Sequence, residues 1–242
     1  MRKLAISEVF YSIQGEGKTA GFPAVFVRLG GCNLMCGGMG TQFTGELMNG
    51  ATFRCDTLEV WMNAQAKAVE EILDDECVEA INDGANVIIT GGEPTMQQDA
   101  VVDFIQYIRE FINPEVFVEI ETNGTILPSD ALFREVDQWN VSPKLSNSGN
   151  TRNQTYQPEV IKAVSRMNAM FKFVVTTESE WEEIRVDYLP IVKREQVWLM
   201  PSGEDKNLLS ESAPAVAEIC KRERLKYTSR LHIDIWNKKT GV

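Results

Sequence analysis

Three cysteines in the first quarter of the chain are the residues best suited to chemistry. Cys32 and Cys36 follow an apolar run at 24–29, and Cys55 comes 19 residues after Cys36. Zinc normally takes four protein ligands in a structural site, and the single histidine, His232, lies far downstream. An iron–sulfur cluster held by three cysteines leaves one iron open to bind another group. The three thiols therefore favour such a cluster, with a zinc site as the alternative.

The remaining two cysteines fit a structural role. Cys77 and Cys220 each lie three or four residues from other apolar side chains, which is the pattern of one face of a helix. Buried thiols of this kind behave as small hydrophobic side chains. We therefore expect the five cysteines to divide into three ligands and two core residues.

The overall composition restricts the class of protein. The chain has 242 residues, of which 43% are hydrophobic, and this suits one compact α/β enzyme domain. Its net charge of −11 opposes binding to nucleic acid backbones and to acidic membranes. The sequence contains no apolar run typical of a signal peptide or a membrane span, so we expect a cytoplasmic protein with reduced thiols.

Short β-rich runs alternate with amphipathic segments, which predicts parallel strands joined by helices. The predicted strands cover 4–12, 24–29, 86–90, 115–121, 139–142, 170–176, 196–200 and 231–236. Helices are predicted within 62–82 and 97–112, and around 132–136, 181–184 and 216–220. As a strand, 231–236 places His232, Asp234 and Trp236 on one face.

Six motifs occur in the order found in one enzyme family. They are SIQGEG (12–17), VRLGGCNLMC (27–36), CDT (55–57), TGGEPTMQ (90–97), ETNGT (121–125) and SPK (142–144). On these motifs the chain resembles the 7-carboxy-7-deazaguanine synthases of the radical S-adenosylmethionine (SAM) superfamily. The resemblance covers nearly the whole chain. It implies a single radical SAM domain, 1–242, of the α/β class, folded as an incomplete (β/α) TIM-like barrel.

The cysteine spacing departs from that of the family. Radical SAM enzymes usually carry a CxxxCxxC motif, whereas 18 residues separate Cys36 from Cys55 here. Segment 37–54 therefore corresponds to an insertion in the cluster loop, and its five glycines suit a tight excursion. Because CDT follows intact, we expect Cys55 to be the third ligand. In the alternative, the insertion displaces Cys55 and leaves the site incomplete.

The resemblance assigns SAM binding to the ends of several strands. The glycine-rich turn after 86–90 lets a ligand approach the backbone, and Glu93 offers a carboxylate to an ammonium group. Without the resemblance, an ordinary turn with a solvated Glu93 would be the commoner interpretation. The residues implied in SAM binding are Gly91, Gly92, Glu93, Ser142, Pro143, Lys144 and Lys172.

A second set of residues is implied in binding the substrate. Gln14 and Glu16 can read the donor and acceptor edge of a pterin, with a surface turn as the alternative. Arg28 lies in an apolar strand and needs an anionic partner, either a substrate carboxylate or a nearby Asp or Glu. His232 is equally consistent with a structural role. The implied substrate residues are Ile13, Gln14, Gly15, Glu16, Arg28, Thr90 and His232, and Thr57 resembles the position that offers a hydroxyl to Mg²⁺.

Two further carboxylates lie in the predicted strand 115–121. Glu119 and Glu121 project from the same face, because side chains alternate along a strand. The inner face of a barrel and the surface of an edge strand explain this pair equally well. Glu119 therefore receives no role from the sequence.

The resemblance implies a ring contraction. In this reaction, 6-carboxy-5,6,7,8-tetrahydropterin becomes 7-carboxy-7-deazaguanine with loss of ammonia. The implied cofactors are a [4Fe-4S] cluster on Cys32, Cys36 and Cys55, SAM and Mg²⁺. The implied partners are a one-electron donor such as flavodoxin or ferredoxin and a second copy in a homodimer, with no direct nucleic acid or membrane partner. Two other functions remain open, a radical SAM activase acting on a protein and a non-catalytic zinc-binding module.

Overall fold

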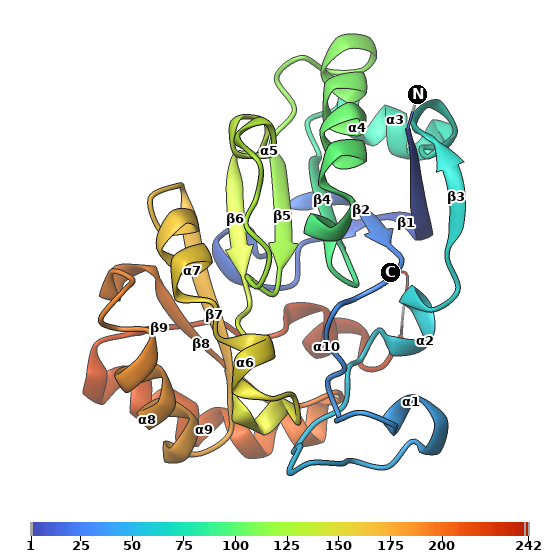
Figure 1. The fold of residues 1–242 in the computed structure, drawn as a ribbon. Helices are drawn as coiled ribbons and strands as arrows, with labels where there is room; N and C mark the ends of the chain where they lie inside the picture. The colour runs from blue at the N-terminus through green and yellow to red at the C-terminus, as the bar shows by residue number, and fades with distance from the viewer. Residues whose placement is uncertain (1, 240, 242) are drawn as a thin grey trace.

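One open sheet forms the centre of the computed structural model, which describes residues 2–239 and 241 (Figure 1). Its strand order is β3-β1-β2-β4-β5-β6-β7-β8-β9. Strand β1 runs antiparallel to β2 and β3, and the other neighbouring strands pair in parallel. The strands are β1 (Lys3–Ile13), β2 (Pro23–Leu29), β3 (Gln65–Ala68), β4 (Asn86–Gly91), β5 (Val118–Thr122), β6 (Gln138–Val141), β7 (Ala169–Val175), β8 (Val197–Pro201) and β9 (Lys226–Tyr227).

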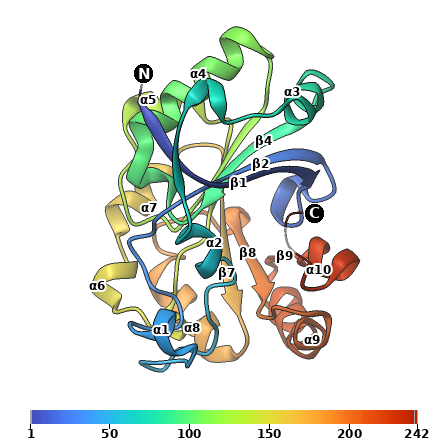
Figure 2. The same ribbon diagram turned by 90° about the vertical axis from the view of Figure 1, so that its right-hand side faces the viewer.

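Helices join the parallel strands and cover the outside of the sheet (Figures 1 and 2). The α-helices are α1 (Thr41–Thr44), α2 (Leu58–Trp61), α3 (Asp75–Asn82), α4 (Gln98–Phe111), α5 (Asp130–Glu135), α6 (Arg152–Thr155), α7 (Pro158–Val164), α8 (Glu178–Asp187), α9 (Lys206–Glu223) and α10 (Leu231–Trp236). Short 3₁₀ helices are η1 (Gly17–Thr19), η2 (Val69–Glu71), η3 (Pro94–Gln97), η4 (Ser146–Ser148) and η5 (Arg194–Gln196). Within the described residues, none of the helices combines the length and apolar character needed to cross a membrane.

This architecture confirms the predicted α/β fold, an incomplete TIM-like barrel. The sheet begins at β3 and ends at β9 without pairing these edges to each other. Parallel strands joined by helices place their carboxyl ends at one end of the sheet, which is where barrel enzymes bind their ligands. Both ribbon views place α1, from the cysteine-rich segment, on the side toward which the strand arrows point.

The two faces of the strands have different environments. Val25, Val27 and Leu29 of β2 are buried in the large apolar core between the sheet and the outer helices. Ala24 and Phe26 alternate with them and point to the inside, where Phe26 stacks on Phe10 of β1. The period-two pattern of the sequence therefore separates core side chains from barrel-lining side chains.

The inner face also carries a buried polar network. The Glu119 carboxylate, fully buried on the central strand β5, accepts hydrogen bonds from Asn86 Nδ2 at 3.1 Å and Asn140 Nδ2 at 2.8 Å. Burial raises the pKa of Glu119 above its usual value, and the neighbouring Glu121 adds to this, although the amide donors oppose it. Of the two interpretations of this pair, the structure therefore supports the inner face of the barrel.

The predicted strand 231–236 is wrong, because this segment is the helix α10. The two-residue strand β9 is the last of the sheet, and residues 231–236 pair with none of its strands. The N–H groups of Ile233 and Asp234 bond instead to the carbonyl of Arg230, which begins a helical turn. Alternation of apolar residues over so short a run does not decide between strand and helix.

The predicted helix 62–82 is only partly correct. Residues 65–68 form β3 and pair with β1, and α3 begins after Asp74, whose side chain accepts a hydrogen bond from Cys77 N at 2.9 Å. Val69 still reaches the core from the 3₁₀ turn η2, which mimics helical spacing. Cys77 and Cys220 are buried in the apolar core, as predicted.

Replacing Glu119 with Gln should change how stability depends on pH. Because the pKa of Glu119 is raised in the folded state, the free energy of unfolding of the wild-type protein falls as Glu119 ionises at higher pH. We expect the free energy of unfolding of Glu119→Gln, relative to wild type, to increase from pH 5 to pH 8 in anaerobic urea titrations. The control is Glu115→Gln, which removes an exposed carboxylate just before β5. A Glu119→Gln curve parallel to wild type would contradict the prediction.

Candidate functional site

A cavity of about 1110 Å³ opens at the carboxyl ends of the parallel strands. Sixteen of the eighteen predicted site residues line it, and the two exceptions are Glu93 and Pro143. Those that line it are Ile13, Gln14, Gly15, Glu16, Arg28, Cys32, Cys36, Cys55, Thr57, Thr90, Gly91, Gly92, Ser142, Lys144, Lys172 and His232. The fold therefore brings together motifs that are spread over more than 200 residues of sequence.

Segment 37–54 starts after Cys36 and brings the chain back beside Cys36 at Cys55. The backbone N–H of Cys55 donates to the carbonyl of Cys36 at 3.2 Å. Within the insertion, Met48 N donates to Gly37 O at 2.8 Å and closes the excursion. Thr52 N donates to Asn147 O at 2.9 Å, which ties the returning chain to the segment after β6. The structure thus keeps Cys55 in the cysteine loop rather than displacing it.

The surroundings of the cysteines fit a metal cluster. Burial raises the pKa of Cys32 to about 11 and of Cys36 to about 12, and the nearby Cys55 thiol contributes in the same direction. Thiols in this position become thiolates only when positive charge is supplied, which bound metal does. Amide nitrogens of Asn123 and Asn150 lie 3.9 Å from Cys32 Sγ and 3.8 Å from Cys36 Sγ.

The three cysteine thiols line one cavity. Among the residues that the structure describes, no three His, Cys, Asp or Glu side chains converge on the position of one metal ion. In a [4Fe-4S] cluster each cysteine binds a different iron, so its ligands surround a space instead of meeting at a point. The three cysteines that line this cavity are therefore compatible with a [4Fe-4S] cluster.

The glycine-rich turn after β4 lies directly against the cysteine loop. A Cβ atom on Gly92 would lie 1.8 Å from the carbonyl oxygen of Gly31 and 3.1 Å from Cys32 N. Glu93 N donates to the same Gly31 oxygen at 2.8 Å. Only glycine permits this approach, which sets the distance between the turn and the cluster loop.

The Glu93 side chain is hydrogen-bonded within the protein. Its carboxylate is completely buried, does not line the cavity, and accepts from Thr95 N, Thr122 Oγ1 and Asn123 N at 3.0, 2.7 and 2.7 Å. It therefore joins the β4 turn to the end of β5, and its contact with a ligand ammonium group stays a prediction. Pro143 is likewise buried and outside the cavity.

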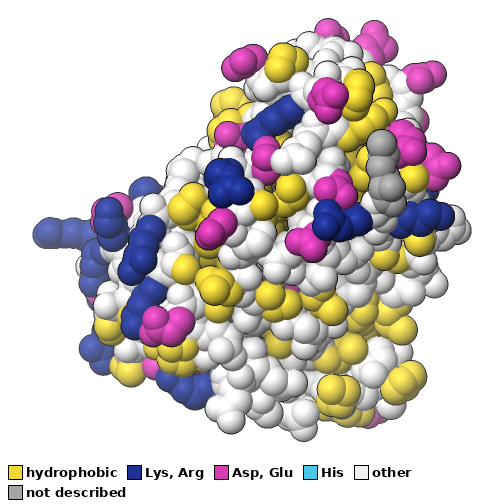
Figure 3. Space-filling view, turned by 45° about the horizontal axis from the view of Figure 1, so that its top comes forward, with side chains coloured by type: hydrophobic (Ala, Val, Ile, Leu, Met, Phe, Trp, Pro, Cys, Tyr) yellow, Lys and Arg dark blue, Asp and Glu magenta, His cyan; other side chains and the backbone are white. Residues whose placement is uncertain are grey.

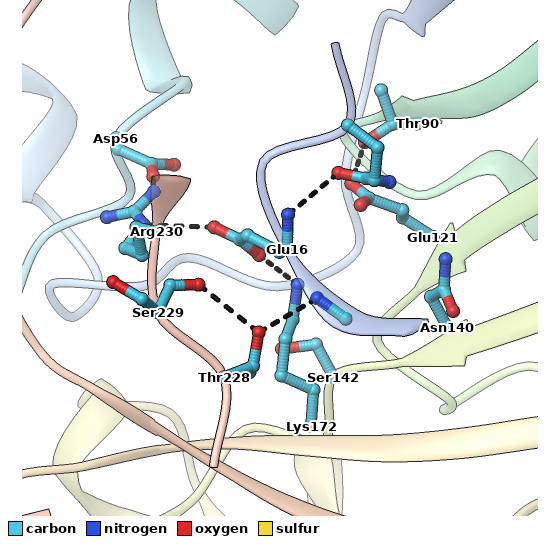
Figure 4. A network of polar contacts seen from close by, with 12 residues as sticks. Glu16, Asp56, Thr90, Glu121, Asn140, Ser142, Lys172, Thr228, Ser229 and Arg230 are labelled. Atoms are coloured by element: carbon cyan, nitrogen blue, oxygen red, sulfur yellow. Dashed lines mark hydrogen bonds and ion pairs between the residues drawn. The ribbon is translucent and has the colours of Figure 1, made fainter. Parts of the chain in front are cut away.

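Buried charges meet at the centre of the cavity (Figure 4). Glu16 Oε2 forms an ion pair with Lys172 of β7, and Glu16 Oε1 lies 3.0 Å from Arg230 Nε. The side chains of Glu16, Lys172 and Arg230 are only 12%, 7% and 14% exposed. Burial opposes the charge on Glu16, but the charges of Lys172 and Arg230 outweigh it and hold its pKa well below the usual range.

Arg230 is a site residue that the sequence analysis missed. Besides Glu16, its guanidinium pairs with Asp56, next to Cys55, and donates to Gly203 O at 2.9 Å. It thereby connects the substrate motif 12–17 to the cluster loop. Its place two residues before His232 was the available signal, but an arginine outside any recognised motif gives no indication of its partners.

His232 lies over the motif 12–17. A Cβ atom on Gly15 would lie 2.1 Å from His232 Nδ1, and Leu231 N donates to Gly15 O at 2.8 Å. Burial lowers the pKa of His232 and the charge of Arg230 contributes, although Glu16 opposes them. The carboxyl-terminal segment therefore covers the Gln14–Gly17 turn.

The remaining polar residues also find protein partners. Arg28 Nε lies 3.1 Å from Glu8 Oε1, so of its two predicted kinds of partner the structure contains a protein carboxylate. Thr90 Oγ1 donates to Glu121 Oε2 at 2.7 Å, and Glu121 and Asn140 are further cavity residues that the sequence analysis left unassigned. Thr57 precedes α2 without capping it, and its hydroxyl lies 3.5 Å from Cys55 Sγ.

The contact between Gly92 and Gly31 predicts a specific loss of metal. In Gly92→Ala the new methyl group must displace the cysteine loop, so we expect lower iron content per chain and a loss of about 1–3 kcal/mol in unfolding free energy. Iron analysis and urea titration measure the two effects. Gly84→Ala is the control, because it strains a positive φ before β4 but has open space around the methyl group. Wild-type iron content in Gly92→Ala would contradict the proposed contact.

Comparisons with known proteins identify the family of this chain. Residues 13–129 match the family model Fer4_12, described as a 4Fe-4S single cluster domain. The 7-carboxy-7-deazaguanine synthase of Pyrobaculum aerophilum is 33% identical over 242 residues, covering 99% of this chain and 97% of the relative. That of Halobacterium salinarum is 32% identical over 259 residues, covering 97% and 91%.

A solved structure supports the fold independently. The crystal structure of QueE from Escherichia coli superposes with a TM-score of 0.64 at 22% identity, over 95% of each chain. Identity this low supports the architecture alone, whereas the near full-length relatives establish the family. The chain belongs to the 7-carboxy-7-deazaguanine synthase family.

Proposed function

We propose that this chain is a 7-carboxy-7-deazaguanine synthase that converts 6-carboxy-5,6,7,8-tetrahydropterin to 7-carboxy-7-deazaguanine with release of ammonia. The observation that carries the proposal is the meeting of the cysteine loop, the glycine-rich turn and the Gln14–Gly17 turn in one cavity. Near full-length relatives with this name support it. They favour it over both the activase and the zinc-binding module.

The cofactors have suitable residues around the cavity. Cys32, Cys36 and Cys55 would hold a [4Fe-4S] cluster, and Thr57 would offer its hydroxyl to Mg²⁺. The cluster and SAM, when bound, supply a 5′-deoxyadenosyl radical that takes a hydrogen atom from C6 of the substrate. SAM would lie against the backbone of the Gly91–Gly92 turn, with the polar residues Ser142, Lys144 and Lys172 at the next strand ends.

The side chains of this chain bind and orient the pterin. Gln14 is buried, its Oε1 accepts from Glu16 N at 3.1 Å, and its Nε2 has no partner among the described residues. A buried donor without a partner is costly, and a ring acceptor of the pterin would satisfy it. Glu16 keeps free lone pairs for ring N–H groups beside its two ion pairs. The guanidinium of Arg28 lines the cavity. It would bind the substrate carboxylate while it keeps its ion pair with Glu8.

The resemblance and the composition supply the remaining parts of the proposal. We infer a single radical SAM domain with its insertion at 37–54, acting as a homodimer in the cytoplasm. A one-electron donor such as flavodoxin or ferredoxin would reduce the cluster. Excess negative charge is consistent with an enzyme that acts on a free pterin and not on nucleic acid.

An anaerobic assay tests the function. Reconstituted protein, SAM, Mg²⁺, a reductant and the carboxy-tetrahydropterin should yield 7-carboxy-7-deazaguanine, identified by mass, without any protein partner. Cys55→Ala should lose both iron and product, whereas Cys77→Ala, which alters a core thiol, should keep its iron. Zinc without iron in the wild-type protein, or full iron content in Cys55→Ala, would overturn the assignment.

Arg230 should act as a positioning residue for Glu16. In Arg230→Gln the Glu16 carboxylate keeps Lys172 but loses its second cation, so we expect KM for the pterin to rise about tenfold, which corresponds to roughly 1.4 kcal/mol, with a smaller change in kcat. Arg222→Gln, at an exposed arginine of α9, is the control. Equal losses in kcat and in kcat/KM would assign Arg230 a different role.

A further inference from the structure

A second cavity, of about 590 Å³, lies at the opposite end of the sheet from the proposed active site. It is formed by the segments that lead into β7, β8 and β9 and by the 3₁₀ helix η1. Four cationic side chains line it, together with one carboxylate, Glu195: they are Lys18, Arg166, Lys193 and Lys226. Its volume falls in the range of small-molecule sites.

What these four cations share is that they line one cavity without an ion-pair partner among the described residues. None of them forms an ion pair within the described part of the chain, although acidic residues outnumber basic ones by 35 to 24. Lys18 Nζ donates to the neutral oxygens of Gln138 and Asn168 at 3.0 Å, and Lys226 Nζ to the backbone oxygen of Glu195 at 2.7 Å. On the face shown in Figure 3, Lys and Arg side chains gather along the left-hand side, where Figure 1 places β8 and β9.

The cations also repel one another. Burial lowers the pKa of Lys18, and the charge of Lys226 lowers it further, while the buried Glu119 behind it acts in the opposite direction. Like charges that line one cavity favour an anion between them. The net charge of −11 repels anions from the molecule as a whole. Anion binding therefore requires a local cluster of positive charge.

We propose that this cavity binds a small oligophosphate, either free or carried by a nucleotide. Phosphate groups suit it because lysine ammonium groups and an arginine fork offer several charged donors within one hollow. A hollow of this size, formed where several loops meet, also suits a compact anion better than an extended nucleic acid strand.

The position of the two lysines connects this cavity to the substrate motif. Lys18 follows Glu16 by two residues, and Lys226 precedes Thr228 by two. Gly17 N donates to Thr228 Oγ1 at 2.9 Å, and Arg230 pairs with Glu16. An anion that bridges Lys18 and Lys226 therefore holds together the two segments, 14–18 and 226–231, that enclose Glu16. The proposed binding does not depend on the proposed enzymatic function.

Calorimetric titration of the anaerobic holoprotein tests the binding, with inorganic pyrophosphate and ADP as separate ligands. We expect both to bind at low ionic strength, and the double variant Arg166→Gln/Lys193→Gln to bind at least tenfold more weakly. This variant leaves the segments around Glu16 unchanged. The matched control is Lys3→Gln/Lys67→Gln, which removes the same charge from unpaired lysines on β1 and β3.

The titration has clear opposing outcomes. Tighter binding of ADP than of pyrophosphate would identify a nucleotide, and the reverse a free oligophosphate. The site would be overturned if neither pyrophosphate nor ADP bound the wild-type protein, or if both double variants bound them equally weakly. Sulfate that bound as tightly as pyrophosphate at the same ionic strength would also overturn it. Tighter binding of a short single-stranded oligonucleotide would replace it with a nucleic acid surface.

Hydrogen exchange tests the connection to Glu16. With pyrophosphate bound, the amides of Gly17 and Leu231 should exchange several-fold more slowly, because their acceptors, Thr228 and Gly15, lie in the joined segments. Arg166→Gln/Lys193→Gln should lose this protection at the same ligand concentration. Binding without slower exchange at these amides would overturn the connection while leaving the anion site in place.

Discussion

The ion pairs of Glu16 are the interaction on which the geometry of the site depends. Glu16 belongs to the turn after β1, Lys172 to β7, and Arg230 to the segment after β9, so the three charges come from both sides of the open sheet. Each charge is largely buried and would be unfavourable alone, which makes each of them require the others. A closed barrel joins its edge strands by a hydrogen-bonded ladder, whereas in this open barrel buried charges connect the turn after β1 with β7 and with the segment after β9.

The cysteine loop accommodates segment 37–54 because both ends of this segment are held in place. A metal site requires its ligands to be held in place, and the length of chain between them matters little if the end points are fixed. Here the Cys36 carbonyl and the Cys55 N–H bond directly. The carbonyls of Asn147 and Ser148 accept from Thr52 N and Gly37 N, which anchors both ends of the insertion. These two carbonyls follow the SPK motif, so one segment supports the cluster loop and approaches the SAM region.

How much the sequence can predict depends on the range of the interactions involved. The parallel strands follow from local alternation and turn residues, and the cavity residues from motifs at strand ends. Arg230 could not be found in this way, because its acidic partners lie 214 and 174 residues away. The protein partners of Glu93 could not be predicted either, since the groups that bond to it belong to the end of the next strand. The helix α10 was missed because strand pairing, which would have favoured an extended segment, ends before it.

Inside this barrel a column of hydrogen-bonded polar groups accompanies the small apolar cluster around Phe26, and the large apolar core lies outside, under the helices. The column runs from Lys18 through Gln138 to Asn140 and Glu119, and each step is a side-chain hydrogen bond of 3.0, 3.2 or 2.8 Å. Polar groups buried in this way have few alternative arrangements, because each broken bond leaves a partner unsatisfied. Glu16 lines the first cavity, and Lys18, the next charged residue of the same turn, lines the second. The hydrogen bond from Lys18 to Gln138 therefore fixes this turn to the polar column.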